Sequence, residues 1–158
     1  MDDFRVRFGP SMDGCGDMIL MAEDDDDDFW FFEMAFKKQG EGFNLSRVKD
    51  GEEAIAYLSG KGAYSDRERH PVPGLIILDI KMPRKNGFEV LEWLRQHPQL
   101  KGTRAIILSS SEEPRDKKKA SELGASSYLV KPRQYHQYKF LVEGISETWL
   151  KKGGKDGE

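Results

Sequence analysis

The sequence LIILD at residues 75–79 decides the fold. Four aliphatic residues in a row, ended by the acid Asp79, are typical of a strand that is buried on both faces of a parallel sheet. The next segment, MPRKNG at residues 82–87, predicts a turn. Apolar residues at helical spacing then predict a helix that ends before Pro98.

The same order of strand and helix repeats on both sides of this unit. Short apolar runs that stop at polar residues predict strands, and apolar residues three and four apart predict helices. The strands are expected at residues 18–22, 43–48, 105–108 and 128–130, and the helices at residues 29–38, 52–58, 114–123 and 138–149. Five βα units in a row predict an α/β protein with a doubly wound parallel sheet.

Length and composition limit the class of protein. The 158 residues are enough for one domain. We expect a flexible extension at residues 1–17, the domain at residues 18–151 and a disordered tail at residues 152–158. A formal net charge of -3 gives no broad basic surface for nucleic acid. The single cysteine, Cys15, and the lack of a long apolar run favour a cytoplasmic protein without a membrane partner.

Polar side chains follow four of the predicted strands, at the point where each strand ends. Glu23 and Asp24 follow the first strand, Asp79 the third, Ser109 the fourth and Lys131 the fifth. Binding sites in open α/β sheets lie beyond the carboxyl ends of the strands. We therefore expect these five side chains to meet at one edge of the sheet.

Carboxylates that meet at one site repel each other and need a cation. Mg²⁺ prefers oxygen ligands and keeps several of its waters. We expect Asp24 and Asp79 to bind Mg²⁺ directly, Glu23 to bind through a water molecule, and the backbone carbonyl of Lys81 to complete the protein ligands.

The same arrangement suits a phosphoryl acceptor. An aspartate carboxylate can attack a phosphoryl group in line and form an acyl phosphate, so Asp79 is the expected nucleophile. The ammonium group of Lys131 and the hydroxyl of Ser109 are expected to stabilise the phosphoryl oxygens.

Three segments carry a resemblance to a known family: AEDD at residues 22–25, LIILDIKMPRKNG at residues 75–87 and SSYLVKP at residues 126–132. Over residues 18–151 the chain resembles response-regulator receiver domains of two-component systems. It is most similar to the single-domain regulators that pair with phytochrome-like histidine kinases. The resemblance implies a flavodoxin-like (βα)5 fold with strand order 2-1-3-4-5.

The resemblance also implies a mechanism and partners. The chain would take a phosphoryl group on Asp79 from a sensor histidine kinase or a phosphotransfer protein, using Mg²⁺. It would catalyse this transfer and slow dephosphorylation without being an enzyme for another substrate. The output would pass to other proteins through the face formed by the fourth helix, the fifth strand and the fifth helix, which could also form a homodimer.

Family roles fall on particular residues. Glu23 and Asp24 become the acidic pair, Ser109 the switch hydroxyl, Tyr128 the switch aromatic and Lys131 the phosphate-binding amine. A cis peptide bond is expected between Lys131 and Pro132, as is usual in the family. Residues 26–28 are expected to be solvated acids at a helix start.

Three aromatic residues of the last helical segment, Tyr135, Tyr138 and Trp149, have two interpretations. All three could form a dimer contact, and Tyr138 and Trp149 could instead anchor the helix to the sheet. The sequence leaves this choice open.

Two other functions compete with the receiver. An aspartyl-nucleophile phosphatase would also use Asp79 and Mg²⁺, but it needs an acid two residues after the nucleophile, where this chain has Lys81. A receiver-like binding module that never takes phosphate would not need Glu23, Asp24 and Lys131 together.

Overall fold

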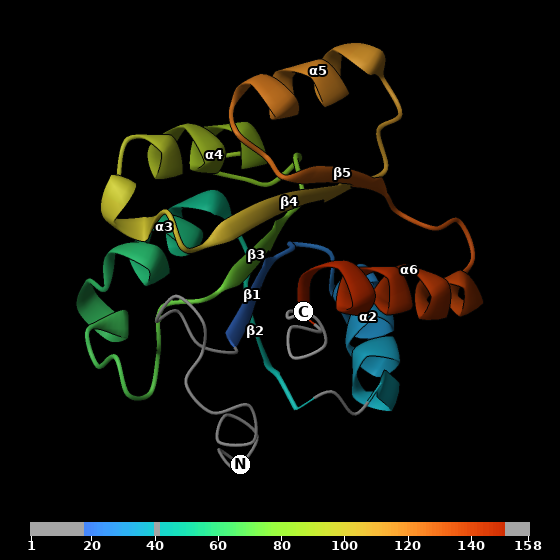
Figure 1. The fold of residues 1–158 in the computed structure, drawn as a ribbon, viewed down its shortest axis with the longest axis horizontal. Helices are drawn as coiled ribbons and strands as arrows, with labels where there is room; N and C mark the ends of the chain where they lie inside the picture. The colour runs from blue at the N-terminus through green and yellow to red at the C-terminus, as the bar shows by residue number, and fades with distance from the viewer. Residues whose placement is uncertain (1–17, 40–41, 151–158) are drawn as a thin grey trace, which may run out of the picture.

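A computed structural model describes residues 18–39 and 42–150 of the chain. Its core is a sheet of five parallel strands in the order β2-β1-β3-β4-β5 (Figure 1). The strands are β1 (Met18–Ala22), β2 (Asn44–Val48), β3 (Leu75–Leu78), β4 (Arg104–Ser109) and β5 (Ser127–Val130). The predicted fold class and strand order are confirmed.

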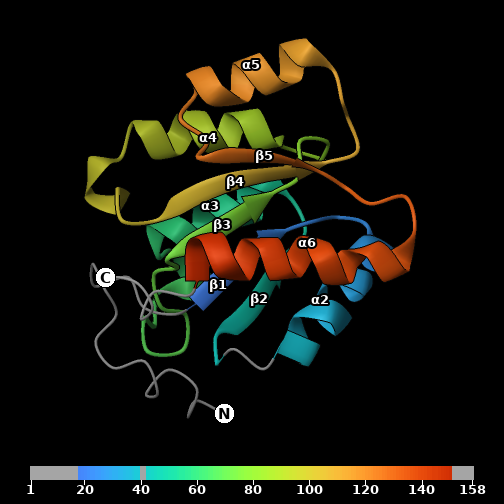
Figure 2. The ribbon, with the colours of Figure 1, turned by 45° about the vertical axis from the view of Figure 1, so that its right-hand side comes forward.

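Helices cover both faces of the sheet. One face carries α3 (Gly51–Ser59), α4 (Gly87–Arg95) and α5 (Pro114–Glu122), and the other carries α2 (Asp26–Gln39) and α6 (Tyr138–Ile145) (Figures 1 and 2). A π-helical turn, Ser146–Leu150, continues α6, and short 3-10 turns lie at Gly62–Tyr64, Pro98–Leu100 and Tyr135–Gln137. The elements match the predicted ones except for small shifts at their ends.

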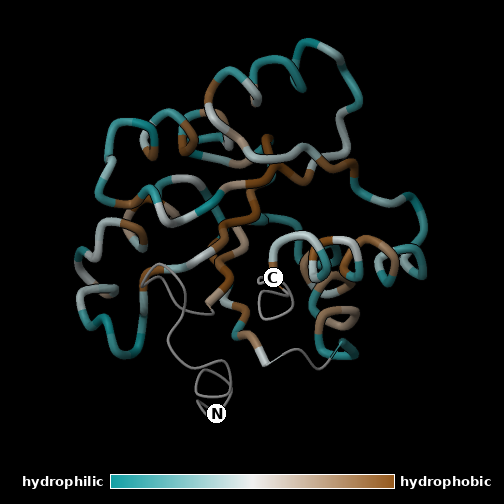
Figure 3. The backbone as a smooth tube through the Cα atoms, in the orientation of Figure 1, coloured by the Kyte–Doolittle hydropathy of each residue, from teal (hydrophilic) through white to brown (hydrophobic). Residues whose placement is uncertain are grey.

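The alternating directions of side chains along β3 explain the two hydrophobic cores. Ile76 and Leu78 pack in the core under α3, α4 and α5, whereas Leu75 and Ile77 pack in the core under α2 and α6. All four residues are buried, so β3 has no solvent face. The strands accordingly form the hydrophobic centre of the chain in Figure 3.

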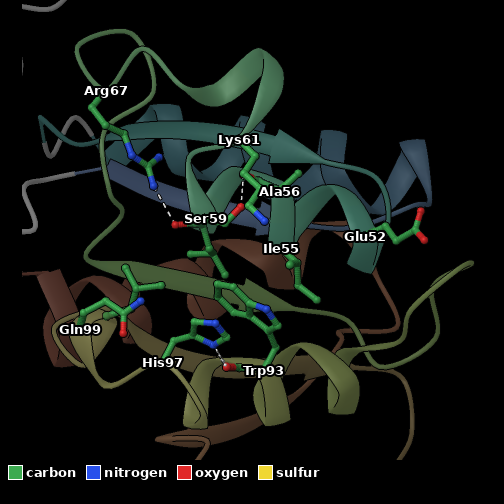
Figure 4. A pocket seen from close by; sticks show the side chains of 11 residues that line it. Glu52, Ile55, Ala56, Ser59, Lys61, Arg67, Trp93, His97 and Gln99 are labelled. Carbon is green, nitrogen blue, oxygen red and sulfur yellow. Dashed lines mark hydrogen bonds between the residues drawn. The ribbon is translucent and has the colours of Figure 1, made fainter.

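Residues 60–74 form the loop predicted before β3, and Arg67 holds this loop in place. Its guanidinium donates hydrogen bonds to the carbonyl oxygens of Tyr57 at 2.9 Å, Leu58 at 2.7 Å and His70 at 3.0 Å. Arg67 therefore caps the last turn of α3, where carbonyl groups lack partners within the helix. The loop borders a cleft of about 600 Å³ (Figure 4).

Two predictions about the ends of the chain lie outside the described residues: the extension at residues 1–17 and the tail at residues 152–158. No helix in residues 18–39 or 42–150 combines the length and the hydropathy needed to cross a bilayer.

Candidate phosphoryl-acceptor site

The carboxyl ends of β1 and β3 bring three acids together, as predicted. The carboxylate oxygens that Glu23, Asp24 and Asp79 can offer to a metal lie within 4.8 Å of one another. Glu23 is almost fully buried at 1% exposure and Asp79 at 7%, whereas Asp24 is exposed. The cluster therefore has two acids in the protein interior and one at its opening.

Lys131, which follows β5, points its ammonium group into this acid cluster. Its Nζ lies 2.9 Å from Glu23 Oε1 and donates hydrogen bonds to Asp79 Oδ2 at 3.1 Å and Asp28 Oδ2 at 2.8 Å. An ammonium group has three N–H donors, so three carboxylates match its capacity. The structure thus brings Glu23, Asp79 and Lys131 together, as the sequence predicts.

Asp28 is a site residue that the sequence analysis missed. It was expected to be solvated, but its side chain contacts Lys131 and keeps only 31% exposure. The start of α2 explains the error. Asp25 caps the helix by accepting a hydrogen bond from the backbone N–H of Asp28 at 2.9 Å, so the first turn points Asp28 toward Lys131.

Asp26 is exposed, as predicted, and it also forms an ion pair. Arg47 of β2 contacts Asp26 Oδ1 at 2.9 Å and donates from Nε to the carbonyl oxygen of Glu23 at 2.9 Å. Arg47 thereby ties the β1–α2 loop, which carries the acidic pair, to the neighbouring strand. Hydrogen bonding to Arg47, helped by the charge of Lys49, lowers the pKa of Asp26.

Burial and mutual repulsion change the acidities in the cluster. Burial, reinforced by the charge of Asp79, raises the pKa of Glu23 to about 7. Burial also raises the pKa of Asp79, although Lys131 opposes this shift. Burial acts to lower the pKa of Lys131, but its contacts with Asp28, Glu23 and Asp79 outweigh burial and raise that pKa. Lys131 therefore stays positively charged at neutral pH, whereas Glu23 is partly protonated there.

Charge makes the cluster suitable for a divalent cation. Three carboxylates, those of Glu23, Asp28 and Asp79, contact the ammonium group of Lys131, and an oxygen of Asp24 lies within 4.8 Å of oxygens of Glu23 and Asp79. Among the described residues, Lys131 Nζ at 2.9 Å is the one donor that approaches the buried Glu23 Oε1. Carboxylate oxygens are the ligands that Mg²⁺ and Mn²⁺ favour, so the residues fit the expected metal.

The shift of Glu23 predicts how stability depends on pH without metal. Because the pKa of Glu23 is raised in the folded chain, its contribution to the free energy of unfolding is fully present below its ordinary pKa of 4.5. That contribution is lost as pH rises through about 7. In buffer with EDTA, we expect the free energy of unfolding to fall between these values with a slope of about 1.4 kcal/mol per pH unit.

Urea denaturation at several pH values checks this expectation, with Glu23→Gln as the comparison. The glutamine variant should lose that slope and be the more stable protein at pH 8. Equal pH profiles for the two proteins would show that Glu23 ionises normally.

The backbone after Asp79 is held close to the start of α4. A Cβ atom added to Gly87 would collide with the backbone carbonyl oxygen of Asp79. The N–H of Gly87 also donates to the carbonyl oxygen of Ile80 at 3.0 Å. Asn86 caps α4 through a hydrogen bond from the backbone N–H of Glu89. The lack of a side chain at Gly87 thus allows the start of α4 to pack against the backbone of Asp79.

Ser109 and Tyr128 are both hydrogen-bonded to Ser111 of the β4–α5 loop. Ser109, at the end of β4, is buried at 1% exposure, and its hydroxyl oxygen accepts a hydrogen bond from the N–H of Ser111 at 3.1 Å. The Tyr128 hydroxyl donates to the carbonyl oxygen of the same Ser111 at 2.8 Å. Both predicted switch residues are therefore attached to one loop residue.

The expected cis bond before Pro132 is wrong. All peptide bonds of the described residues are trans, including the bond between Lys131 and Pro132. Lys131 reaches the site without it, because its N–H donates to the carbonyl oxygen of Ser109 at 2.8 Å and extends the pairing of β4 and β5 by one residue. This backbone bond fixes the point from which the Lys131 side chain leaves the strand.

The aromatic residues of the last helical segment separate into two groups. Tyr138 is buried at 3% exposure and packs on Phe31 of α2, and Trp149 packs partly buried against the same core. For these two residues, anchoring to the sheet is confirmed. Tyr135 is 68% exposed and is not part of the core.

Comparisons with known proteins agree with this fold. A family model described as the response regulator receiver domain matches residues 19–142. The response regulator Rcp1 of Synechocystis sp. is 34% identical over 133 residues, which cover 84% of this chain and 88% of Rcp1.

Solved structures agree as well. The phosphorylated cyanobacterial phytochrome response regulator RcpA is similar with a TM-score of 0.80 at 32% identity, covering 85% of this chain and 94% of RcpA. The Mn²⁺-bound form of Rcp1 is similar with a TM-score of 0.78 at 33% identity, covering 86% of this chain and 96% of that protein. The chain therefore belongs to the response regulator receiver domain family, close to the phytochrome response regulators Rcp1 and RcpA.

Proposed function

We propose that the chain accepts a phosphoryl group on Asp79 from a sensor histidine kinase and passes the signal on through protein contacts. One observation carries this proposal: the buried Asp79 carboxylate at the end of the central strand, with Lys131 Nζ at 3.1 Å and two further acids beside it. The names of the relatives point to a phytochrome-like kinase, and a phosphotransfer protein would present the same phosphohistidine chemistry.

Asp79, Lys131 and Ser109 each have a different role in the proposed phosphoryl transfer. An Asp79 oxygen attacks phosphorus in line, its bond to phosphorus forms as the bond to the donor nitrogen breaks, and the electron pair leaves with the imidazole. Lys131 donates an N–H to one phosphoryl oxygen, and the Ser109 hydroxyl donates to another. The product is an acyl phosphate on Asp79.

Four residues would hold Mg²⁺ in this proposal. Asp24 and Asp79 supply carboxylate oxygens, Lys81 supplies its backbone carbonyl, and Glu23 acts through a water molecule. Bound Mg²⁺ would neutralise the charge that develops on the phosphoryl oxygens. The Mn²⁺-bound form of Rcp1 supports a divalent ion in this family, and the converging carboxylates support it in this chain.

The signal would leave through the face made by α5, β5 and α6. A phosphoryl group on Asp79 draws the Ser109 hydroxyl toward it, and this movement disturbs the loop at Ser111 that holds the Tyr128 hydroxyl. Tyr128 then changes position on β5 and alters this face. NMR amide shifts of Ser109 and Tyr128 that stay the same after phosphorylation would argue against this coupling.

Asp28 competes with the phosphoryl group for contact with the ammonium group of Lys131. To bind a phosphoryl oxygen, Lys131 must break one of its contacts with the three carboxylates. Asp28 is the most exposed of these carboxylates. We expect Asp28→Asn to bind beryllofluoride, an analogue of the phosphoryl group, about threefold to tenfold more tightly.

The matched control is Asp27→Asn, since the two substitutions remove the same charge from the same helical turn. Titration followed by tryptophan fluorescence measures both affinities. If both variants gain equally, the gain comes from net charge, and the contact of Asp28 with Lys131 has no part in it.

The two competing functions find less support. A phosphatase of this kind would need an acid where Lys81 stands, and Lys81 is exposed. A binding module without phosphate chemistry would not need the contact of Lys131 with Asp79. We further propose a cytoplasmic location with no nucleic-acid or membrane partner, in keeping with one cysteine and a net charge of -3.

Incubation with acetyl phosphate tests the proposed function directly. With Mg²⁺ present, intact-mass spectrometry should show uptake of a single phosphoryl group that is lost on base treatment, as an acyl phosphate requires. EDTA should abolish the uptake. A phosphatase would release phosphate catalytically, and a binding module would show no mass change.

A further inference from the structure

One residue of the loop between β3 and α4 has a strained backbone. Arg84 has a φ of 65°, in the left-handed region, and it is the only non-glycine residue with a positive φ in the part of the chain that the structure describes. A side chain adopts this conformation at a cost, because its Cβ atom approaches the following carbonyl oxygen. Strain of this kind persists where surrounding contacts hold it. The strained residue lies in the loop that joins Asp79 to α4 and that carries Lys81.

Two acids at the start of α3 hold the Arg84 side chain. Its Nη1 donates to Asp50 Oδ2 at 3.1 Å, and its Nε lies 3.8 Å from Glu52 Oε1. Asp50 is itself fixed, because its Oδ1 accepts a hydrogen bond from the backbone N–H of Glu53 at 2.8 Å and caps α3. The Asp50 side chain is only 14% exposed. Arg84 therefore binds an acceptor that is already in place, whereas ordinary exposed ion pairs must order both partners and contribute little.

The backbone makes a second contact between the same two segments. The N–H of Gly51 donates to the carbonyl oxygen of Lys85 at 3.0 Å. A Cβ atom added to Gly51 would collide with that oxygen, so the start of α3 and the β3–α4 loop touch directly. The Asp50–Arg84 ion pair and the Gly51–Lys85 hydrogen bond together are called the loop clamp. The loop clamp ties the strained part of the loop to α3.

Lys81 lies between the loop clamp and another backbone bond. On the strand side, the N–H of Gly87 donates to the carbonyl oxygen of Ile80 at 3.0 Å, and on the other side the chain is held at Arg84. The carbonyl of Lys81 is the ligand that the proposed function assigns to Mg²⁺. Because Mg²⁺ demands near-ideal octahedral geometry, a small displacement of one ligand weakens its binding. A loop released at Arg84 would displace this carbonyl.

We propose that Arg84 is a positioning residue for the metal site. Its ion pair with Asp50 holds the strained loop in the conformation that presents the Lys81 carbonyl to Mg²⁺. Arg84 acts through the backbone and touches neither the metal nor the phosphoryl group. This inference rests on the proposed function, because it uses the metal ligands given there.

A Mg²⁺ titration of the full chain, followed by the NMR amide shifts of residues 80–82, tests the proposal. Arg84→Ala loses the ion pair and keeps the strain, so the dissociation constant of Mg²⁺ should rise about tenfold. Arg84→Gly loses the pair but relieves the strain, and a rise of about threefold is expected. Removal of a positive charge alone would favour a cation, so net charge cannot produce these losses.

Variants of Asp50 and Arg95 complete the comparison. Asp50→Asn keeps the helix cap and loses the charge that Arg84 contacts, so it should also weaken Mg²⁺ binding. The double variant Asp50→Asn/Arg84→Ala should bind Mg²⁺ no more weakly than Arg84→Ala, because both changes break one contact. Arg95→Ala is the matched control. Arg95 is 54% exposed and forms a 3.1 Å ion pair with Glu92, compared with 59% exposure and 3.1 Å for Arg84, and its loss should leave the affinity unchanged.

Amide hydrogen exchange in EDTA gives a readout without metal. The N–H of Gly51 belongs to the loop clamp, so it should exchange about threefold to tenfold faster in Arg84→Ala than in the unmodified chain. The amides of β4 should exchange at unchanged rates. Equal acceleration of Gly51 and β4 would indicate general destabilisation and would overturn the proposal.

The Mg²⁺ titrations separate this proposal from the proposed function. If the unmodified chain binds Mg²⁺ and the Arg84 variants bind it equally well or more tightly, Arg84 positions nothing, and the proposed function stands. An unmodified chain that binds no Mg²⁺ overturns both.

Discussion

Asp79→Asn is expected to take up no phosphoryl group from acetyl phosphate with Mg²⁺, whereas the unmodified chain takes up one. The amide keeps the size of the side chain but is too weak a nucleophile to form the acyl phosphate. Asp79 is also the buried acid that Lys131 contacts at 3.1 Å. Intact-mass spectrometry checks the result, with a loss of at least about 10³-fold in rate expected.

The stability of Asp79→Asn to urea distinguishes a loss of phosphoryl uptake from misfolding. Burial raises the pKa of Asp79, so the folded chain holds its charge at a cost, and the neutral amide should be at least as stable to urea as the carboxylate. Asp27→Asn, in the first turn of α2, is the control for charge and should be phosphorylated normally. Phosphoryl uptake by Asp79→Asn on another residue would move the acceptor assignment away from Asp79.

Lys131→Met is expected to cause the second largest effect, on stability as well as on phosphorylation. Methionine retains most of the side-chain volume but leaves the carboxylates of Glu23, Asp28 and Asp79 without their ammonium partner. Breaking a buried ion pair by removing one partner costs about 3–5 kcal/mol. We expect a loss toward the lower end, because protonation of Glu23 relieves part of the repulsion.

The pH and the metal distinguish this mechanism from lost packing. The destabilisation should be larger at pH 8 than at pH 6, since Glu23 has a pKa of about 7 in the unmodified chain. Mg²⁺ should restore part of the lost stability, because it supplies positive charge to the same acids. Phosphorylation should stay at least about 10²-fold slower even with Mg²⁺.

Urea titrations of the Lys131→Met variant and of Lys118→Met on α5 give the comparison. Lys118 is exposed, so its substitution should change neither stability nor phosphoryl uptake. A loss in Lys131→Met that is equal at both pH values and insensitive to Mg²⁺ would indicate a packing defect.

The succession of strands and helices and the main site residues could be predicted from local sequence patterns, whereas the order of the strands in the sheet followed from the resemblance to receiver domains. Residues 75–79 form a run of aliphatic residues ended by an acid, and parallel strands place their carboxyl ends at one edge. Once the five strands are known, Glu23, Asp24, Asp79, Ser109 and Lys131 must lie near that edge. The structure brings the acids and Lys131 together there.

Other features depend on geometry that spacing does not reveal. Asp24 to Asp28 are identical in type, and the choice of Asp28 as the partner of Lys131 depends on where α2 begins. An acid three residues beyond a helix cap, opposite a strand-end lysine, would have been the signal for this contact. The trans bond before Pro132 could not be predicted from the order of residues. Lys131 is directed to the site by a backbone hydrogen bond between β5 and β4, and such a contact between strands is not visible in the local sequence.

A crystal structure of the chain with Mg²⁺ and beryllofluoride tests the central claim most directly. We expect an adduct on Asp79, with Mg²⁺ bound by Asp24, Asp79 and the carbonyl of Lys81, and with Lys131 and Ser109 donating hydrogen bonds to fluorine atoms. An adduct on another residue would contradict it, as would a Lys131 that makes no contact with the adduct.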